Sequence, residues 1–298
     1  MASQSTFRTF EMPVGMVVGA LFCRPIAAVD AAAAGLLTPA FICAMLFLTF
    51  CRVDARKIRF SWMHLWLILF QIVGSLAVFH ALRSFDLVLA QGAMVCVLAP
   101  VAMAAVVIAG MLGANLETMA AYTLLCNIVI AFVAPIMLHA YGNGECTMLQ
   151  ILQRVAPMLI GPFVAGQLCR HYLKRVSEWV SAHSNLSFYI WLLSLTVIIG
   201  RTTCFILDHD EANRITELLL ALAAFVICVL QFIVGRRIGR HYGDTVAGGQ
   251  SLGQKNTVLA VWLSQSFLDP ISSVAPTAYI VWQNLVNSFQ LWRSGRQK

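Results

Sequence analysis

A run of nine residues near the end of the chain places glycines, amides and one lysine inside an otherwise apolar stretch. The run reads GGQSLGQKN, from Gly248 to Asn256, and the apolar segment VLAVWL follows almost at once. In hydrocarbon every free backbone N–H and C=O group needs a partner, so irregular polar backbone persists only where it lines a cavity or is buried in protein. The run therefore predicts a broken membrane helix of the kind that forms transporter binding sites.

Lys255 is the charged residue of this run, and three interpretations of it stay open. Its ammonium could reach the membrane surface, with the stem packed on an apolar wall. It could instead occupy the place of a sodium ion, bonded to Gln71 and to backbone carbonyls, or pair directly with an anionic substrate. Because placing a charge at membrane depth costs at least about 2.5–3.5 kcal/mol, such a residue is a functional candidate. The second and third interpretations are compatible with each other.

The composition defines the surroundings of these residues. Hydrophobic residues make up 60% of the chain and charged residues only 11%, with a mean hydropathy of +0.80. A soluble domain carries about 25% charged residues, so the sequence predicts an integral membrane protein. We expect one all-α transmembrane domain over residues 1–298, and no cleavable signal peptide is apparent at its start.

The length allows about ten membrane helices of roughly 20 residues each. The expected spans are 13–29, 35–52, 61–80, 86–112, 115–141, 147–170, 185–207, 212–235, 249–268 and 271–292.

Basic residues predict the orientation of the spans, because cytoplasmic loops carry an excess of Lys and Arg. Most of the 20 basic residues fall on one side: Arg8, Arg52, Arg56, Lys57, Arg59, Arg170, Lys174, Arg175, Arg236, Arg237, Arg240, Arg293, Arg296 and Lys298. The opposite loops hold Arg24, Arg83, Arg154, Arg201 and Arg214. We therefore expect a multi-pass protein of a bacterial inner (plasma) membrane with both termini in the cytoplasm. The lipid bilayer is its expected surrounding; nucleic acid is not an expected partner, since no aromatic-rich basic module is present, and no obligate protein partner is evident.

The two halves of the chain share an order of features. LFQIVGS, with Gln71, precedes a span interrupted by Pro100, and LQFIVGR, with Gln231, precedes the span interrupted by the polar run. Each interrupted span is followed by one containing a proline, Pro135 or Pro276. Five helices per half is an odd number, so the halves must be inverted in the membrane, as in many secondary transporters.

The chain resembles the bile acid:sodium symporter family over nearly its full length. The matching segments are AQGAMVCVLAP (90–100), Gly113-Ala-Asn115, Pro135, GPFVAG (161–166), Gly253-Gln-Lys-Asn256, Leu259-Ala260, Pro276 and Trp282-Gln-Asn284. The resemblance implies that broken helices four and nine cross near mid-membrane. It also implies a core over about 60–144 and 208–292, beside a panel over about 11–59 and 145–207.

The resemblance further implies two sodium sites, and this chain departs from both. At the first, the matching positions are Ala105, Val106, Met119 and Thr123, of which only Thr123 offers a side-chain oxygen. At the second, Gln71 is retained, but Ser251 and Lys255 stand where the family has a glutamate and a glutamine, with Gln254 beside them. Sodium as a coupling ion is therefore doubtful. A desolvated lysine more readily loses its proton, so coupling to protons stays open, and no other cofactor or metal is expected.

The expected substrate-binding residues are Asn256, Gln283, Asn284 and Lys255, the first three because they resemble positions lining the family's substrate cavity. Hydrogen bonding between helices is the competing interpretation of these amides. Asn115, followed by Glu117, is expected to cap a helix.

Other functions fit less well. Gly249-Gln-Ser251-Leu-Gly253 matches a hydrolase pattern that needs a later histidine, and the last histidine is His241, so we expect no enzyme. An exchanger of related crossed-helix fold would need carboxylates at the crossing, and the acidic residues lie in loops or near span ends. The prediction is a secondary transporter of an organic anion, bile-acid-like or a small carboxylate or sulfonate, working by alternating access and independent of sodium. The alternatives are a sodium-coupled symporter with reduced ion sites, or a cation/proton exchanger.

Overall fold

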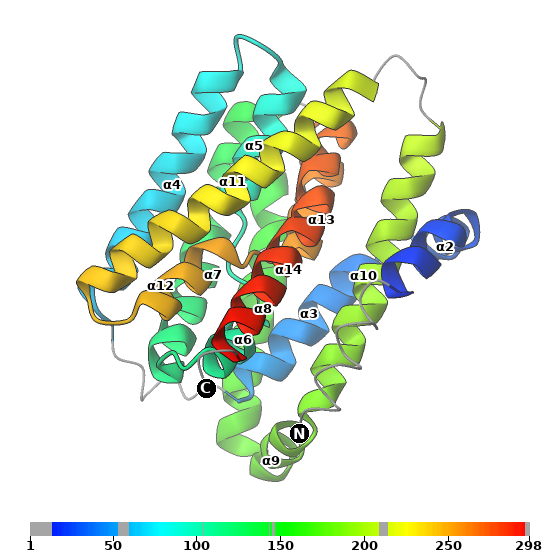
Figure 1. The fold of residues 1–298 in the computed structure, drawn as a ribbon. Coiled ribbons are helices and arrows are strands. Elements are labelled where there is room, and N and C mark those ends of the chain that lie inside the picture. The colour runs from blue at the N-terminus through cyan, green and yellow to red at the C-terminus, as the bar shows by residue number, and fades with distance from the viewer. Residues whose placement is uncertain are drawn as a thin grey trace. The chain divides into compact units, whose positions relative to one another are not determined.

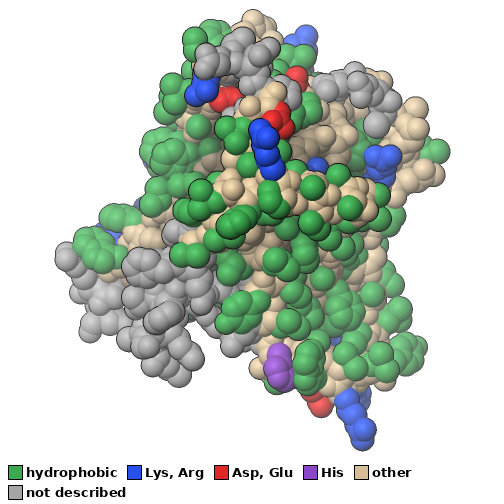
Figure 2. Space-filling view, turned by 90° about the vertical axis from the view of Figure 1, so that its right-hand side faces the viewer, with side chains coloured by type: hydrophobic (Ala, Val, Ile, Leu, Met, Phe, Trp, Pro, Cys, Tyr) green, Lys and Arg blue, Asp and Glu red, His purple; other side chains and the backbone are tan. Residues whose placement is uncertain are grey.

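The computed structural model describes residues 14–52, 60–102, 104–142, 144, 147–208 and 214–295. Every secondary-structure element assigned in these residues is a helix (Figure 1). On the face drawn in Figure 2, hydrophobic side chains cover most of the surface and charged side chains are few. An all-helical protein with an apolar exterior agrees with the composition.

The chain divides into two compact units. Unit 1 comprises residues 1–52 and 161–213, and unit 2 comprises residues 53–160 and 214–298. The first helices are α2 (Cys23–Ala32), α3 (Leu37–Phe50), α4 (Trp62–Leu82), α5 (Leu87–Leu98), α6 (Ala104–Met111), α7 (Leu116–Tyr141) and α8 (Met148–Tyr172). They are followed by α9 (Lys174–Ala182), α10 (Ser184–Asp208), α11 (Arg214–His241), α12 (Thr245–Gly253), α13 (Thr257–Phe267), the 3₁₀ turn η3 (Pro270–Ser273) and α14 (Val274–Gly295). The functional division into a moving panel and a core stays a prediction.

Among the described residues, four helices are each long and apolar enough to cross a membrane, namely α4, α7, α8 and α11. A fifth span arises if Val14–Leu21 and α2, which are bent by 78° at a short break, count as one. The two predicted broken spans appear as the short pairs α5 with α6 and α12 with α13. The fold is thus that of a multi-pass membrane protein, and the count of ten spans in two inverted repeats stays a prediction.

Polar side chains start several helices at the positions where four backbone N–H groups lack partners. Asp86 caps α5 through Leu89 N, Asn115 caps α7 through Glu117 N and Thr118 N, and Asp244 caps α12 through Ala247 N. The predicted cap at Asn115 is confirmed. These caps fix where the helices around the central crossing begin.

The polar run at 248–256 folds differently from the prediction of a long irregular segment. Residues 248–253 are helical, as the last turns of α12, and only Gln254 to Asn256 break the helix. The glycines serve packing instead. A Cβ on Gly248 would collide with the backbone at Gly235 and Gly239 of α11, so α11 and α12 approach with backbone against backbone (Figure 1). Small residues permit this approach between membrane helices.

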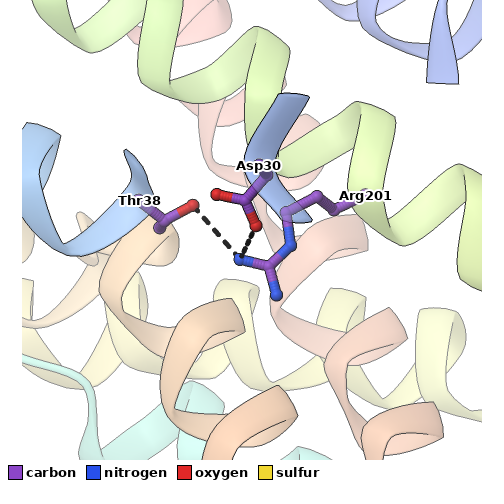
Figure 3. A network of polar contacts seen from close by, with 3 residues as sticks. All are labelled: Asp30, Thr38 and Arg201. Atoms are coloured by element: carbon purple, nitrogen blue, oxygen red, sulfur yellow. Dashed lines mark hydrogen bonds and ion pairs between the residues drawn. The ribbon is translucent and has the colours of Figure 1, made fainter. Parts of the chain in front are cut away.

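An ion pair lies buried within unit 1 (Figure 3). Arg201 Nη1 on α10 lies 3.0 Å from Asp30 Oδ2 on α2 and donates to Thr38 Oγ1 on α3 at 3.5 Å. The side chain of Asp30 is 6% exposed and that of Arg201 24%. The sequence analysis counted Arg201 with the loop residues, although the expected span 185–207 contains it; in the structure it lies within α10, where it pairs with the buried carboxylate of Asp30. Buried charges are normally paired.

Breaking this pair from one side should destabilise the protein more than removing both charges. Asp30→Leu leaves Arg201 without its counter-ion, which we expect to cost about 3 kcal/mol, the lower end for a buried pair because Arg201 is partly exposed. The double variant Asp30→Leu/Arg201→Met should recover most of the loss. Thermal unfolding in detergent measures both, with Thr38→Val as a mild control. A double variant as unstable as Asp30→Leu would contradict this account.

Candidate transport site at the helix crossing

The two breaks of unit 2 meet and are joined by backbone hydrogen bonds. Val101 and Lys255 form an isolated antiparallel bridge. Ala102 N donates to Gln254 O at 2.9 Å, and Asn256 N donates to Pro100 O at 2.8 Å. The irregular backbone of each break thus satisfies the other, which is the condition for non-helical backbone at membrane depth. The predicted meeting of the two breaks is what the structure shows.

Local sequence explains why the first helix stops at this place. Pro100 has no N–H group to donate, and the residue before a proline is pushed toward extended backbone. Ala99 accordingly ends α5 with φ −49° and ψ 137°. The carbonyls of the last turn of α5 therefore have no continuing helix to bond, and they need other donors.

Gln71 of α4 supplies two of those donors. Its Nε2 donates to Leu98 O at 2.7 Å and to Ala99 O at 2.9 Å. Its Oε1 accepts from Tyr122 Oη at 3.0 Å and lies 3.5 Å from Cys126 Sγ, both on α7. A fully buried glutamine with every polar atom occupied holds the end of α5 in place.

Lys255 supplies a further hydrogen-bond donor to the carbonyls at the end of α5. Its Nζ donates to Val97 O at 2.8 Å, and the residue is 1% exposed, which excludes the surface-reaching interpretation. Val97, Leu98 and Ala99 are consecutive, so Lys255 and Gln71 bind neighbouring carbonyls of one helix end. The C-terminal end of a helix carries partial negative charge, and the ammonium lies where it offsets that charge.

A row of amides runs from the crossing along α12 and α14. Gln283 Oε1 accepts from Lys255 N at 2.9 Å. Asn287 donates from Nδ2 to Gln254 Oε1 and accepts at Oδ1 from Gln250 Nε2. Gln250 Nε2 also lies 3.2 Å from Gln290 Oε1. Gln283, Asn287 and Gln290 are spaced four and three residues apart, so they share one face of α14.

The remaining predicted site residues have local partners. Asn256 Oδ1 caps α13 through Leu259 N, and Asn284 Nδ2 donates to Ile280 O of its own helix. Thr123 Oγ1 donates to Met119 O, and Ser251 Oγ donates to Met119 Sδ at 3.5 Å. The structure thus brings Lys255, Gln71, Gln254, Gln283 and Asn256 to the crossing, whereas Asn284, Thr123 and Ser251 bond within or beside their own helices.

The sequence analysis missed residues that complete the crossing. Tyr279 Oη donates to Gly253 O at 3.0 Å, in the last turn of α12. Gln231 Nε2 bonds Tyr279 Oη and Cys96 O, while its buried Oε1 has no partner in the described residues. Gln231 had been noted only as a repeat feature, and its match to Gln71 was a usable signal. The spacing of Gln283, Asn287 and Gln290 within an apolar span was another.

The positions that the resemblance matches to the sodium sites carry few side-chain oxygens. Sodium is bound by several oxygens, but Ala105 and Val106 carry none and Met119 offers sulfur. The hydroxyl of Thr123 donates to Met119 O and keeps its oxygen lone pairs, and an ammonium stands at 255.

Paired helix breaks that meet in the interior define a class of protein, the secondary transporters with discontinuous helices. The comparison with known families agrees. Residues 51–285 match the SBF-like CPA transporter family, and the chain belongs to that family, which is related to the bile acid:sodium symporters. No curated protein matches the chain. The protein is therefore a member of a family of membrane transporters.

Proposed function

We propose that the protein carries an organic anion across the membrane by alternating access, with Lys255 as the charge that makes its crossing functional. The observation that carries the proposal is a buried ammonium at the meeting point of the two breaks, bonded to a neutral carbonyl. Among the described residues no Asp or Glu bonds to Lys255. Buried charges are normally paired, so an anion entering beside the crossing would compensate this one.

The polar groups around Lys255 support the same substrate class. Amides of Gln254, Gln283 and Asn256 lie at the crossing, and amide N–H groups donate hydrogen bonds to carboxylate or sulfonate oxygens. The apolar walls of the surrounding helices suit an amphipathic body such as that of a bile acid. A small carboxylate is the other member of the class, and both belong to the proposal.

The second element of the proposal is independence from sodium. A bound sodium ion at a crossing neutralises the carbonyl ends of broken helices, and the Lys255 ammonium does this without a bound ion, through its bond to Val97 O. A fixed lysine that stays charged would give facilitated diffusion. A lysine that loses its proton during the cycle would couple the anion to the pH gradient.

Rocking of the panel against the core would expose the crossing to each side in turn. The expected setting is a bacterial inner membrane, with both termini in the cytoplasm, as the distribution of Lys and Arg indicates. An exchanger of cations against protons fits less well, because Lys255 occupies the place where such a protein would hold a carboxylate.

Uptake into proteoliposomes tests the proposal. The protein is reconstituted, and a panel of labelled bile acids, small carboxylates and sulfonates is offered with sodium, potassium and pH gradients imposed separately. We expect uptake of at least one anion, at the same rate in sodium and in potassium. Strong sodium dependence would overturn the role assigned to Lys255. Uptake of no anion, together with cation-driven collapse of a proton gradient, would favour the exchanger instead.

A further inference from the structure

A second basic site lies in unit 2 away from the crossing. A cavity of 580 Å³ opens between α11, α12 and α14, with Leu112 from the end of α6 at its edge. Three guanidinium groups line it, those of Arg236 and Arg240 on α11 and of Arg293 on the last turns of α14. The cavity is therefore open to the surface and lined by a cluster of positive charges.

The three charges converge because of helix geometry. Arg236 and Arg240 are four residues apart, so they share a face of α11. The sequence analysis ended this helix at 235, but it continues to His241, and that extension brings the arginines onto the same face as the cavity. Arg293 acts electrostatically on Arg236, as does Arg240. Arg236 is held in position over Gly249, where an added Cβ would come within 2.6 Å of its Cγ.

The three guanidinium groups are not neutralised by the part of the protein that the structure describes. None of them forms a hydrogen bond or an ion pair with another described residue. Like charges held close together repel, so this arrangement costs free energy unless an anion binds between the guanidinium groups and offsets the repulsion. Gln290 adds an amide to the lining.

Apart from Thr245 and Ser294, the rest of the lining is apolar, and part of it reaches the surface. Phe232 forms part of the buried floor, while Ile233 is 43% and Phe289 57% exposed. A small soluble anion would not contact this apolar part of the lining. A ligand with a charged head and a hydrocarbon tail would contact both parts of the lining.

We propose that this cavity binds an anionic phospholipid, with the phosphate on Arg236, Arg240 and Arg293 and an acyl chain along Ile233 and Phe289. Basic pockets between membrane helices are suited to acidic headgroups, and each basic residue near an anionic membrane surface contributes about a fivefold gain in binding. The lining of the cavity does not include Lys255. The proposal therefore stands or falls independently of the proposed function.

Lipid binding to the purified protein tests this. Native mass spectrometry and thermal unfolding are recorded with phosphatidylglycerol, with phosphatidylcholine and with glycerol phosphate as the free headgroup. Of these three ligands, we expect only phosphatidylglycerol to bind and to raise the unfolding temperature. In Arg236→Gln/Arg240→Gln/Arg293→Gln its affinity should fall about a hundredfold, as three such contributions imply.

A matched variant controls for net charge. Arg237→Gln/Lys174→Gln/Arg175→Gln removes the same charge from exposed residues outside the cavity lining, and it should bind phosphatidylglycerol like the unchanged protein. Equal losses in the two triple variants, or equal binding of phosphatidylcholine, would overturn the proposal. Glycerol phosphate producing the full effect would show a soluble-anion site and would overturn the assignment to lipid. If the first triple variant does not fold, Arg293→Gln alone, at an exposed helix end, should still weaken binding several-fold.

Discussion

Replacing Lys255 with methionine should reduce anion uptake by a factor of ten to a hundred. Methionine keeps an unbranched side chain of similar length, so the change removes mainly the ammonium. Val97 O then loses its donor inside the protein, which costs about 1–3 kcal/mol. The carbonyl end of α5 also loses the positive charge that offsets it. The crossing would lose both its fixed geometry and the charge that attracts the anion.

Initial uptake rates in proteoliposomes, together with substrate binding in detergent, measure the effect of Lys255→Met. Lys174→Met is the matched control, because Lys174 is an exposed lysine in α9; it should transport normally. Lys255→Gln serves as a second variant that keeps a hydrogen-bond donor without the charge, and it should also be weakened. Normal uptake by Lys255→Met, with the protein folded and monodisperse, would refute the role of the ammonium.

Substituting Gly235 should be the most destabilising change at the contact between α11 and α12. A Cβ on Gly235 would collide with the backbone carbonyl of Gly248, and one on Gly248 would collide with Gly235 in return. Neither collision can be relieved by a side-chain rotation, since both partners are backbone. For Gly235→Leu we expect a loss of about 3 kcal/mol, the upper end of overpacking costs. The displacement of α12 would also move Lys255, so uptake should fall as well.

Thermal unfolding in detergent measures the effect of Gly235→Leu, and the chain offers a matched control. Gly161 lies in α8 with nothing within 4 Å of the position a Cβ would take. Gly161→Ala should therefore be neutral, or stabilising by about 0.5–1 kcal/mol, since alanine is the better helix former. Similar unfolding temperatures for Gly235→Leu and the unchanged protein would show that the two helices can separate without cost.

The helix break at 254–256 shows what the sequence predicts and what it leaves open. Polar residues in an apolar span located the break near Lys255, because unpaired polar groups at membrane depth demand a special environment. The predicted extent of the break was wrong, because glycine is compatible both with irregular backbone and with close helix packing. Only the position of α11 decides between these, and that position depends on residues far away in the chain.

Partners distant in sequence were likewise beyond prediction. Nothing near Asp30 indicates that Arg201 neutralises it, and both had been assigned to the ends or loops of spans. Lys255 was predicted to bond Gln71 and backbone carbonyls, but not which carbonyl; in the structure the acceptor is Val97 O. Every residue carries such a carbonyl, so the sequence holds no signal for this one. Residues whose type is unusual in a membrane span were predicted from the sequence, whereas the particular backbone groups that they contact were not.

The backbone bonds of the crossing separate its architecture from its chemistry. Ala102 N with Gln254 O, and Asn256 N with Pro100 O, hold the two breaks together without using a side chain. Side chains at the same place can therefore be exchanged without dismantling the fold, as long as the carbonyl ends keep some donor. Variants that change the ion-site positions while keeping these backbone bonds can therefore be built and compared in the laboratory.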